Sequence, residues 1–189
     1  IRSLKIEDAV GILELDSNPK VHAYLGNKPI NTLTEAENTI RFIQQQYEDL
    51  GIGRWAIIEK STENFVGWTG FKYITTTINK HVNYYDLGYR LIESYWNKGI
   101  ASETAKAYLS YAFNDLNLTE VYAICDVENI GSKNLLQKCG LALTLIHSPR
   151  SETRAMSIGA WLNAWKNCCS LSLFRRLSST SLVISTRVP

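Results

Sequence analysis

Apolar residues recur every three or four positions in several stretches of the chain, which is the spacing of one face of an α-helix. These stretches predict helices over residues 6–16, 35–50, 101–116 and 129–139. The second helix starts at Thr34-Glu35-Ala36-Glu37, where a threonine followed three positions later by a glutamate has the pattern of a capping box. Gly51 and Gly140 follow the second and fourth stretches, as glycines often do at helix ends.

Aromatic and β-branched residues dominate four other stretches, which predict strands over residues 54–59, 65–72, 83–91 and 121–127. The polar link 60–64 joins the first two strands as a hairpin, and residues 17–33 read as an irregular loop. Three strands, a helix, a strand and a helix then follow one another, an order that indicates a mixed α/β sheet flanked by helices.

Composition is that of one globular domain, because 45% of the 189 residues are hydrophobic and 20% are charged. A formal net charge of +2 gives no reason to expect a nucleic-acid partner. We expect no membrane span and no metal site, since no apolar run is long enough and the four cysteines lack metal-binding spacing. We therefore expect a cytoplasmic protein with reduced thiols, and the start at Ile1 suggests that the natural N-terminus is missing.

The turn Lys98-Gly99-Ile100-Ala101-Ser102 stands where the third predicted helix begins. A helix N-terminus carries unpaired N–H groups and partial positive charge, which together form an anion site suited to phosphate. Gly99 and Ala101 would let such a group approach the backbone closely. The alternative is a tight turn between a strand and an ordinary helix start.

Two blocks of sequence carry a family resemblance. "YDLGYRLIESYWNKGIASETAKAYLSYAF" resembles the acetyl-CoA-binding block of the GNAT superfamily of N-acetyltransferases, Q/R-x-x-G-x-G/A, with Trp96 at the first position. "ENIGSKNLLQKCGL" is similar to N-x-x-S-x-x-x-L-x-K-x-G-F of the branch that acetylates ribosomal-protein N-termini and small amines, with Leu141 for the phenylalanine. The likeness covers residues 1–141 and implies a mixed, mostly antiparallel central sheet.

The resemblance implies acetyl-CoA as co-substrate and assigns residues to it. The backbone after Trp96 would hold the pyrophosphate, and the strand end would pair with the pantetheine amide as an added strand. Asn129 and Ser132 would line the pantetheine arm and thioester, although Asn129 also suits a plain helix cap. The implied cofactor-binding residues are Leu91, Ile92, Trp96, Asn97, Lys98, Gly99, Ile100, Ala101, Ser102, Asn129 and Ser132.

The implied reaction is direct transfer of an acetyl group to a primary amine, on a protein N-terminus or a small molecule. Many members of the superfamily have a tyrosine acid where this chain has Leu136, so Ser132 becomes the candidate acid, unless it is only a capping or surface serine. Asp86 is the candidate base, with Glu59 and Asp126 as alternatives, although such carboxylates are more often solvated residues or ion-pair partners. The rival interpretation is a catalytically silent CoA-binding module or a defective remnant of an acetyltransferase.

Three histidines, His22, His81 and His147, are scattered without serine or aspartate partners and are predicted to lie on the surface. The sequence leaves the oligomeric state open between a monomer and a homodimer.

Residues 142–189 form a separate, atypical segment. From Ser148 to Pro189 this segment contains nine serines and a single acidic residue, Glu152. The resemblance implies two closing strands here, and 142–146 suits one of them. The rest matches nothing in the family, which suggests a shifted reading frame or a fused sequence. The alternative is a genuine extension with a helix around 155–166.

Overall fold

The computed structural model describes residues 1–78, 81–145 and 155–161. Its centre is a seven-stranded sheet in the order β1-β2-β3-β4-β5-β7-β6. Every described pair of neighbouring strands is antiparallel except β4 and β5, which are parallel. The strands are β1 (Arg2–Ser3), β2 (Arg54–Ile58), β3 (Phe65–Ile74), β4 (Tyr84–Leu91), β5 (Glu120–Asp126), β6 (Ala142–Leu145) and β7 (Ala155–Trp161).

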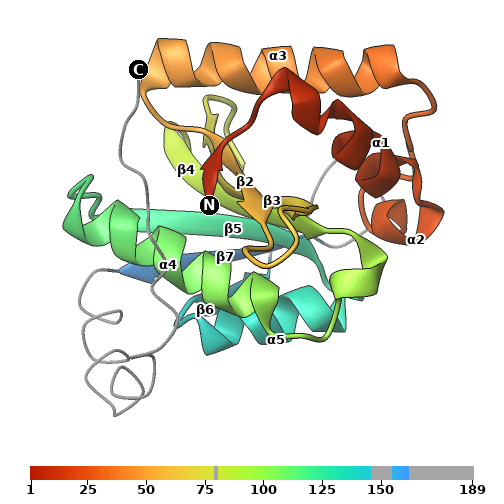
Figure 1. The fold of residues 1–189 in the computed structure, drawn as a ribbon. Helices are drawn as coiled ribbons and strands as arrows, with labels where there is room; N and C mark the ends of the chain where they lie inside the picture. Colours follow the sequence, from red (N-terminus) through yellow and green to blue (C-terminus); the bar gives the residue numbers. More distant parts are fainter. Residues whose placement is uncertain (79–80, 146–154, 162–189) are drawn as a thin grey trace.

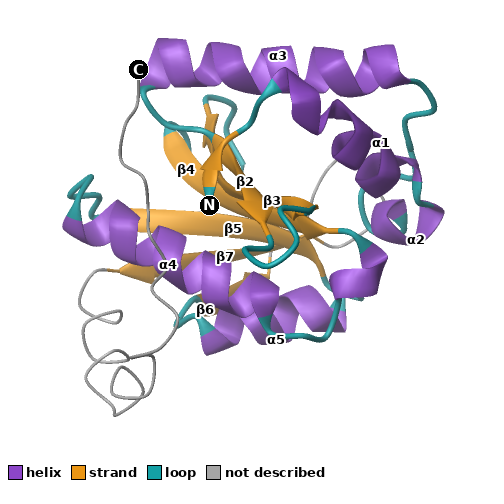
Figure 2. Ribbon diagram, in the orientation of Figure 1, coloured by secondary structure: helices purple, strands orange, loops and turns teal. Residues whose placement is uncertain are grey.

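Helices cover both faces of this sheet (Figures 1 and 2). They are α1 (Ala9–Ser17), α2 (Pro19–His22), α3 (Leu33–Leu50), α4 (Ile100–Asn114) and α5 (Ile130–Lys138), with 3₁₀ turns at Ile6–Asp8 and Glu93–Tyr95. Helices α1 and α3 pack on one face through a core that includes Ile12, Ile40 and Trp68. Helices α4 and α5 pack on the other face, in a core that includes Tyr108 and Leu136.

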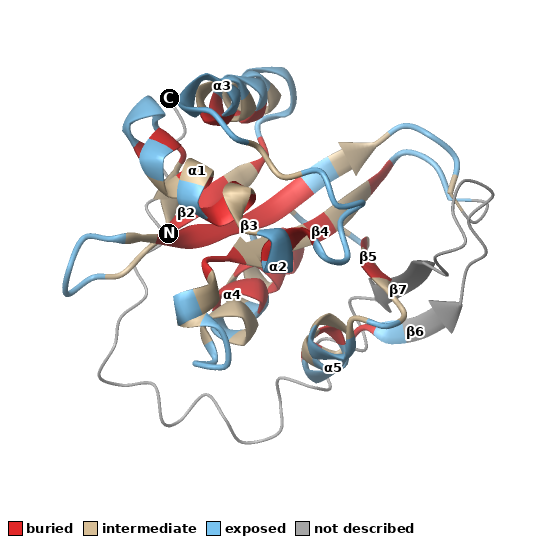
Figure 3. Ribbon diagram, turned by 90° about the vertical axis from the view of Figure 1, so that its right-hand side faces the viewer, coloured by how far each residue is buried: buried red, intermediate tan, exposed pale blue. Residues whose placement is uncertain are grey.

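Alternation along the strands produces these two cores, because successive side chains of a strand point to opposite faces. In β2, Trp55 belongs to the core under α4, while its neighbour Ala56 belongs to the core under α1 and α3. Buried residues run along the middle of the sheet in β2 and β3 (Figure 3). The Tyr108 hydroxyl donates a 2.6 Å hydrogen bond to the Gly53 carbonyl and so ties α4 to the start of β2.

The parallel pair β4 and β5 separates after a single paired position, Asp86 opposite Tyr122. The Asp86 carboxylate also accepts a 3.1 Å hydrogen bond from the Ile124 N–H of β5. Beyond Asp86, β4 continues to Leu91 with no paired residue on β5. Because the two strands are parallel, α4 and α5, which follow them, both begin at this open edge.

The predicted helices and strands of residues 1–141 are confirmed, with ends that differ by a few residues. The cap of α3, however, is Thr32 rather than Thr34. The Thr32 hydroxyl accepts from the Glu35 N–H at 3.3 Å, and the Glu35 carboxylate accepts from the Thr32 N–H at 3.0 Å. Thr32 and Glu35 have the same spacing as Thr34 and Glu37, so the sequence pattern alone could not distinguish the two possible caps. The predicted loop 17–33 also contains α2, which Asn18 caps ahead of Pro19.

The strand expected at 142–146 is confirmed as β6, but the helix expected around 155–166 is wrong for residues 155–161. These residues form β7, which pairs along the whole of β5 and also with β6. Pairing with two neighbours outweighs the weak local pattern of this stretch. Residues 162–166, His147, Cys168 and Cys169 lie outside the described residues. The idea of a foreign tail stays a prediction.

Candidate active site

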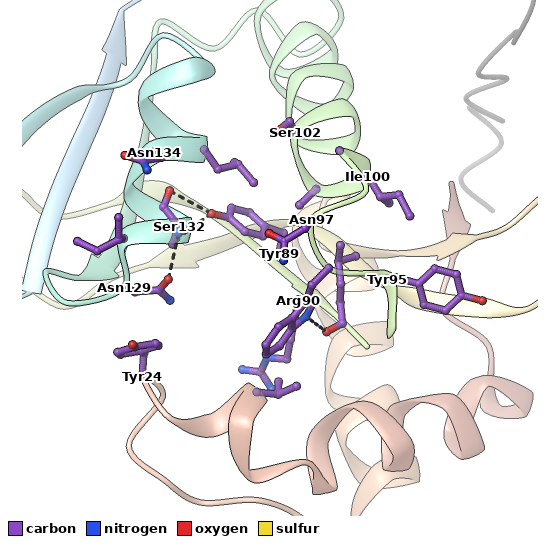
Figure 4. A pocket seen from close by; sticks show the side chains of 18 of the residues that line it. Tyr24, Tyr89, Arg90, Tyr95, Asn97, Ile100, Ser102, Asn129, Ser132 and Asn134 are labelled. Carbon is purple, nitrogen blue, oxygen red and sulfur yellow. Dashed lines mark hydrogen bonds between the residues drawn. The ribbon is translucent and has the colours of Figure 1, made fainter. Parts of the chain in front are cut away.

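A cleft of about 780 Å³ opens where β4 and β5 separate. Its walls come from the end of β4, the start of α4, the start of α5 and the region of α2. Figure 4 shows Tyr89 of β4 between the two helices, with Ser132 and Asn129 on one side and Ile100 and Ser102 on the other. Most of the residues predicted to hold acetyl-CoA line this cleft: Leu91, Trp96, Asn97, Gly99, Ile100, Ala101, Ser102, Asn129 and Ser132.

The wall at the start of α4 exposes backbone donors. Gly99 is the N-cap residue, with a φ of 81° and no side chain to cap the helix. Among the described residues, the N–H groups of Ile100, Ala101 and Ser102 have no hydrogen-bond partner. A Cβ atom at Gly99 would meet nothing within 4 Å, so the glycine is required by its left-handed backbone and faces open space. These are the features that an anion needs at a helix N-terminus.

The turn before α4 is held by Trp96, whose indole N–H donates a 2.8 Å hydrogen bond to the Leu91 carbonyl. Two predicted residues of this turn are not on the cleft. The Ile92 N–H donates to the Val66 carbonyl at 3.0 Å, and the Ile92 side chain is buried. The Lys98 ammonium lies 5.1 Å from the centre of the Tyr95 ring, a cation–π contact.

The wall at the start of α5 combines the two roles considered for Asn129. Its Oδ1 accepts a 3.0 Å hydrogen bond from the Ser132 N–H and caps the helix, while the residue also lines the cleft. The Ser132 Oγ lies 2.7 Å from the Tyr89 hydroxyl. Leu136 is buried in the core. Tyr89 was not among the residues predicted from the sequence, where its only signal was its place in the strand before the turn.

The three candidate bases do not line the cleft. Asp86 lies on the opposite face of β4 from Tyr89, because the two are an odd number of residues apart. Burial raises the pKa of Asp86 to about 7, although the Ile124 N–H and the charges of Arg54 and Lys72 act to lower it. Glu59 accepts a 2.6 Å hydrogen bond from the Thr62 hydroxyl, and Asp126 accepts one of 2.8 Å from the Glu128 N–H. The last two carboxylates therefore stabilise turns.

A buried polar group beside the cleft was also not predicted. Arg90, which lines the cleft, bonds Asp16 of α1 at 2.5 Å, and Asp16 lies 3.7 Å from His22 Nε2. The prediction that His22 is a surface residue is wrong, since it is only 6% exposed. Burial and the nearby Arg90 lower the pKa of His22. The short helix α2 folds His22 inward and leaves its neighbours Lys20 and Val21 on the cleft.

Most of the positive charges on the cleft wall have carboxylate partners. Lys20, Arg90 and Lys138 line the cleft with Glu128, but Lys20 is paired with Glu93 at 2.5 Å and Arg90 with Asp16. The backbone N–H groups of α4 are therefore the main anion-binding feature of the cleft. No group of three or more His, Cys, Asp or Glu residues in the described part of the chain could hold a metal ion. None of the helices described here is both long and apolar enough to cross a membrane.

Residues 1–142 match the family described as acetyltransferase (GNAT) domain. The chain belongs to the GNAT acetyltransferase family. Among its relatives is p20 of Bacillus licheniformis, an uncharacterized N-acetyltransferase that is 30% identical over 72% of this chain and 74% of its own length. The uncharacterized N-acetyltransferase YoaA of Bacillus subtilis is 29% identical over 74% of this chain and 77% of its own. This GNAT chain is thus an N-acetyltransferase that uses acetyl-CoA.

Solved structures show the same fold. A GNAT-family acetyltransferase from Bacillus anthracis superposes with a TM-score of 0.70 at 22% identity, covering 86% of this chain and 93% of its own. Spermidine N-acetyltransferase from Vibrio cholerae, solved with CoA and spermine, gives a TM-score of 0.69 at 19% identity, covering 88% and 96%. The mixed, mostly antiparallel sheet implied by the two sequence blocks is therefore confirmed.

Proposed function

We propose that the cleft holds acetyl-CoA and presents its thioester to a primary amine, which takes the acetyl group directly. One observation carries this proposal: the unpaired edge of β4 and the unpartnered N–H groups of α4 meet in the same cleft. A ligand that suits both must have an extended chain with amides and an anionic group beyond it. The pantetheine arm and pyrophosphate of CoA combine these features.

In this arrangement Asn97 and the start of α4, from Gly99 to Ser102, bind the pyrophosphate. The edge of β4 near Leu91 pairs with a pantetheine amide, as an added strand would. Asn129 and Ser132 face the arm from α5. Ile92 and Lys98 are dropped from the binding set, because the Ile92 N–H is bonded to Val66 and the Lys98 ammonium rests on Tyr95.

The transfer reaction needs a base that accepts the proton of the amine and a group that stabilises the departing sulfur. Ser132 supplies a hydroxyl at the cleft wall and is our candidate for the second role. Asp86 is our candidate for the first, supported by its raised pKa of about 7. Four residues of strand, about 13 Å, separate Asp86 from Arg90 at the cleft. One water molecule cannot bridge this distance, so Asp86 would act through a chain of several water molecules.

The acceptor is a primary amine on a protein N-terminus or a small molecule. The second sequence block supports the branch that acetylates ribosomal-protein N-termini. A structural neighbour from Vibrio cholerae has been proposed to be a ribosomal-protein-serine acetyltransferase, with a TM-score of 0.68 at 19% identity. Another structural neighbour is the spermidine N-acetyltransferase from Vibrio cholerae. The second candidate function is a CoA-binding module without catalysis. It is supported by the buried Leu136, which stands in place of the tyrosine common in the superfamily.

Calorimetric titration of the chain with acetyl-CoA tests the proposal, with the Gly99→Glu variant as the decisive comparison. A carboxylate at Gly99 would occupy the open space beside the N–H groups and repel phosphate, so binding should be lost. Gly51→Glu is the matched control, because Gly51 also has a positive φ of 65° and open space around it but does not line the cleft. Equal binding by the wild type and Gly99→Glu would contradict the proposed cofactor site.

If acetyl-CoA binds, a panel of acceptors separates the enzyme from the silent module. The panel should contain peptides with N-terminal serine or alanine, spermidine and an aminoglycoside. Formation of free CoA thiol with any of them supports acetyl transfer. Tight binding of acetyl-CoA without transfer to any amine would favour the module.

A further inference from the structure

Tyr89 reaches across the floor of the cleft from β4 to α5. Its hydroxyl lies 2.7 Å from the Ser132 Oγ, and at the longer distance of 3.4 Å it donates to the Ser132 carbonyl. Both residues line the cleft. The contact joins two elements that are 43 positions apart in the chain, and Figure 4 shows it as a dashed line.

The hydrogen of the Tyr89 hydroxyl has one favourable acceptor. Burial raises the pKa of Tyr89 far above its ordinary value, so the phenol keeps its proton throughout the neutral range. O–H···O hydrogen bonds are usually about 2.5–3.0 Å long, so the contact at 2.7 Å dominates over the one at 3.4 Å. When Tyr89 donates to the Ser132 Oγ, the hydrogen of the serine hydroxyl must point elsewhere. Ser132 lines the cleft, and the thiol of Cys125 on β5 is a second group within hydrogen-bonding reach of its hydroxyl.

We propose that Tyr89 is a positioning residue: it donates to the Ser132 Oγ and thereby directs the Ser132 hydroxyl hydrogen at the sulfur of CoA. This assignment rests on the proposed function. The amine nitrogen forms a bond to the acetyl carbon, the carbon–sulfur bond breaks, and its electron pair stays on sulfur. The proton of the amine leaves with the base or with water. Ser132 then donates a hydrogen bond to the thiolate, and Tyr89 strengthens it through the chain of two bonds.

Proton transfer along this chain is not part of the proposal. A free phenol has a pKa of about 10 and is no stronger an acid than a thiol, so passing the phenol proton to the thiolate would not be favourable. Burial of Tyr89 makes that transfer harder still. The chain therefore stabilises negative charge on sulfur without neutralising it, and the thiolate takes a proton from water after release.

Other titratable and charged groups lie near Tyr89 and Ser132 and must stay constant in a test. Burial raises the pKa of the Cys125 thiol on β5, although a hydrogen bond from the Ser132 hydroxyl acts to lower it, so the thiol stays neutral near pH 7. A neutral thiol is a weak acceptor and competes poorly with a thiolate for the Ser132 hydrogen. Cys139 approaches Tyr89 from the end of α5. The charged groups that line the same cleft are Lys20, Arg90, Glu128 and Lys138. All of them are unchanged in a comparison between the wild type and Tyr89→Phe.

Affinity for CoA relative to acetyl-CoA, measured by calorimetry from about pH 6.5 to 9, reports the interaction directly and needs no acceptor. Only CoA carries a thiol. Stabilised thiolate lowers the pKa of the bound thiol, so the affinity ratio should rise with pH between the pKa of the bound thiol and that of free CoA, and then level off. One unit of pKa corresponds to a tenfold rise. We expect the affinity ratio to rise about tenfold with pH in the wild type and less than about twofold in Tyr89→Phe and in Ser132→Ala.

Four comparisons make the result specific. Tyr89→Phe should add nothing in a Ser132→Ala background, whereas Ser132→Thr should keep the pH dependence because it keeps the hydroxyl. Tyr85→Phe should behave as the wild type, since Tyr85 lies on the same face of β4 but not on the cleft. Acetyl-CoA binding serves as the check on folding of each variant.

The outcomes separate this assignment from the proposed function. No binding of CoA or acetyl-CoA to the wild type would overturn both. If both ligands bind and the affinity ratio rises with pH as much in Tyr89→Phe as in the wild type, the assignment alone is overturned. Loss of acetyl-CoA binding in Tyr89→Phe would also overturn it, because Tyr89 would then be needed for the shape of the cleft.

Discussion

Arg90 and Asp16 form a salt bridge of 2.5 Å between the strand that walls the cleft and the first helix. Their side chains are 21% and 7% exposed, so the pair is largely withdrawn from water. The Arg90 guanidinium also lies 5.2 Å from the centre of the Trp68 ring, which is itself buried. The bridge therefore fixes the position of α1, and of α2 behind it, relative to the cleft.

Asp16→Asn should lower the free energy of unfolding by about 3 kcal/mol, because it leaves the Arg90 charge buried without a partner. Urea unfolding at pH 7 measures this loss. Glu37→Gln is the matched control, since it breaks the more exposed 2.9 Å pair with Arg41 on α3 and should cost less than about 0.5 kcal/mol. Equal losses in the two variants would show that the Asp16 bridge behaves as a surface pair.

Asn129→Ala should have two effects. Loss of the cap on α5 should lower the free energy of unfolding by about 1 kcal/mol. Affinity for acetyl-CoA should fall as well, because Asn129 lines the cleft. Thr32→Ala removes a comparable cap from α3, whose hydroxyl accepts from the Glu35 N–H, and Thr32 does not line the cleft. Calorimetry and thermal unfolding of both variants should show similar destabilisation with weaker binding only for Asn129→Ala.

Local patterns were enough to predict much of the fold and one wall of the site. Helical spacing and alternation depend on near neighbours in the chain, which is why the elements of residues 1–141 were found. The turn at Gly99 could be predicted for the same reason. A glycine in place of the capping side chain of a helix indicates that a ligand comes close to the backbone. The contact of Asn129 with Ser132 is also local, three residues along one helix.

Contacts between distant parts of the chain could not be predicted. Tyr89 and Ser132 are 43 positions apart, and Arg90 and Asp16 are 74 apart. Nothing in the sequence around the tyrosine or the arginine indicates its partner. His22 is buried 3.7 Å from Asp16 of the same bridge, and β7 forms because β5 and β6 offer it backbone partners. These features follow from the assembled sheet rather than from any one segment.

Gly99→Ala should lower the free energy of unfolding by about 1 kcal/mol, because alanine is strained at a φ of 81°. Gly99→Asn should cost less, since asparagine tolerates this backbone, as Asn97 does two residues earlier with a φ of 60°. Both variants place atoms in the open space of the cleft and should weaken acetyl-CoA binding. Weak binding in Gly99→Asn at near wild-type stability, by calorimetry and thermal unfolding, would separate blockage of the cleft from strain.

Asp86→Asn should change how stability depends on pH. The pKa of Asp86 in the folded chain is about 7, raised from an ordinary value of 3.8 mainly by burial. A raised carboxyl pKa contributes stability that is full below 3.8 and is lost as the pH rises through 7. The melting temperature of the wild type relative to Asp86→Asn should therefore fall between about pH 4 and pH 8. An asparagine can still accept from the Ile124 N–H, so the variant keeps the contact with β5. A constant difference would contradict the raised pKa.

Activity gives the second measure of Asp86, once an acceptor is known. If Asp86 accepts the amine proton through water, it must be ionised, so kcat/KM should rise with pH and bend near 7. Asp86→Asn should remove this bend and lower kcat by about a hundredfold or more, the usual contribution of a general base. Two acceptors with different amine pKa values distinguish the enzyme from the substrate, because a bend that belongs to Asp86 stays at the same pH. An Asp86→Asn variant with wild-type kcat would leave Asp86 only its structural role between β4 and β5.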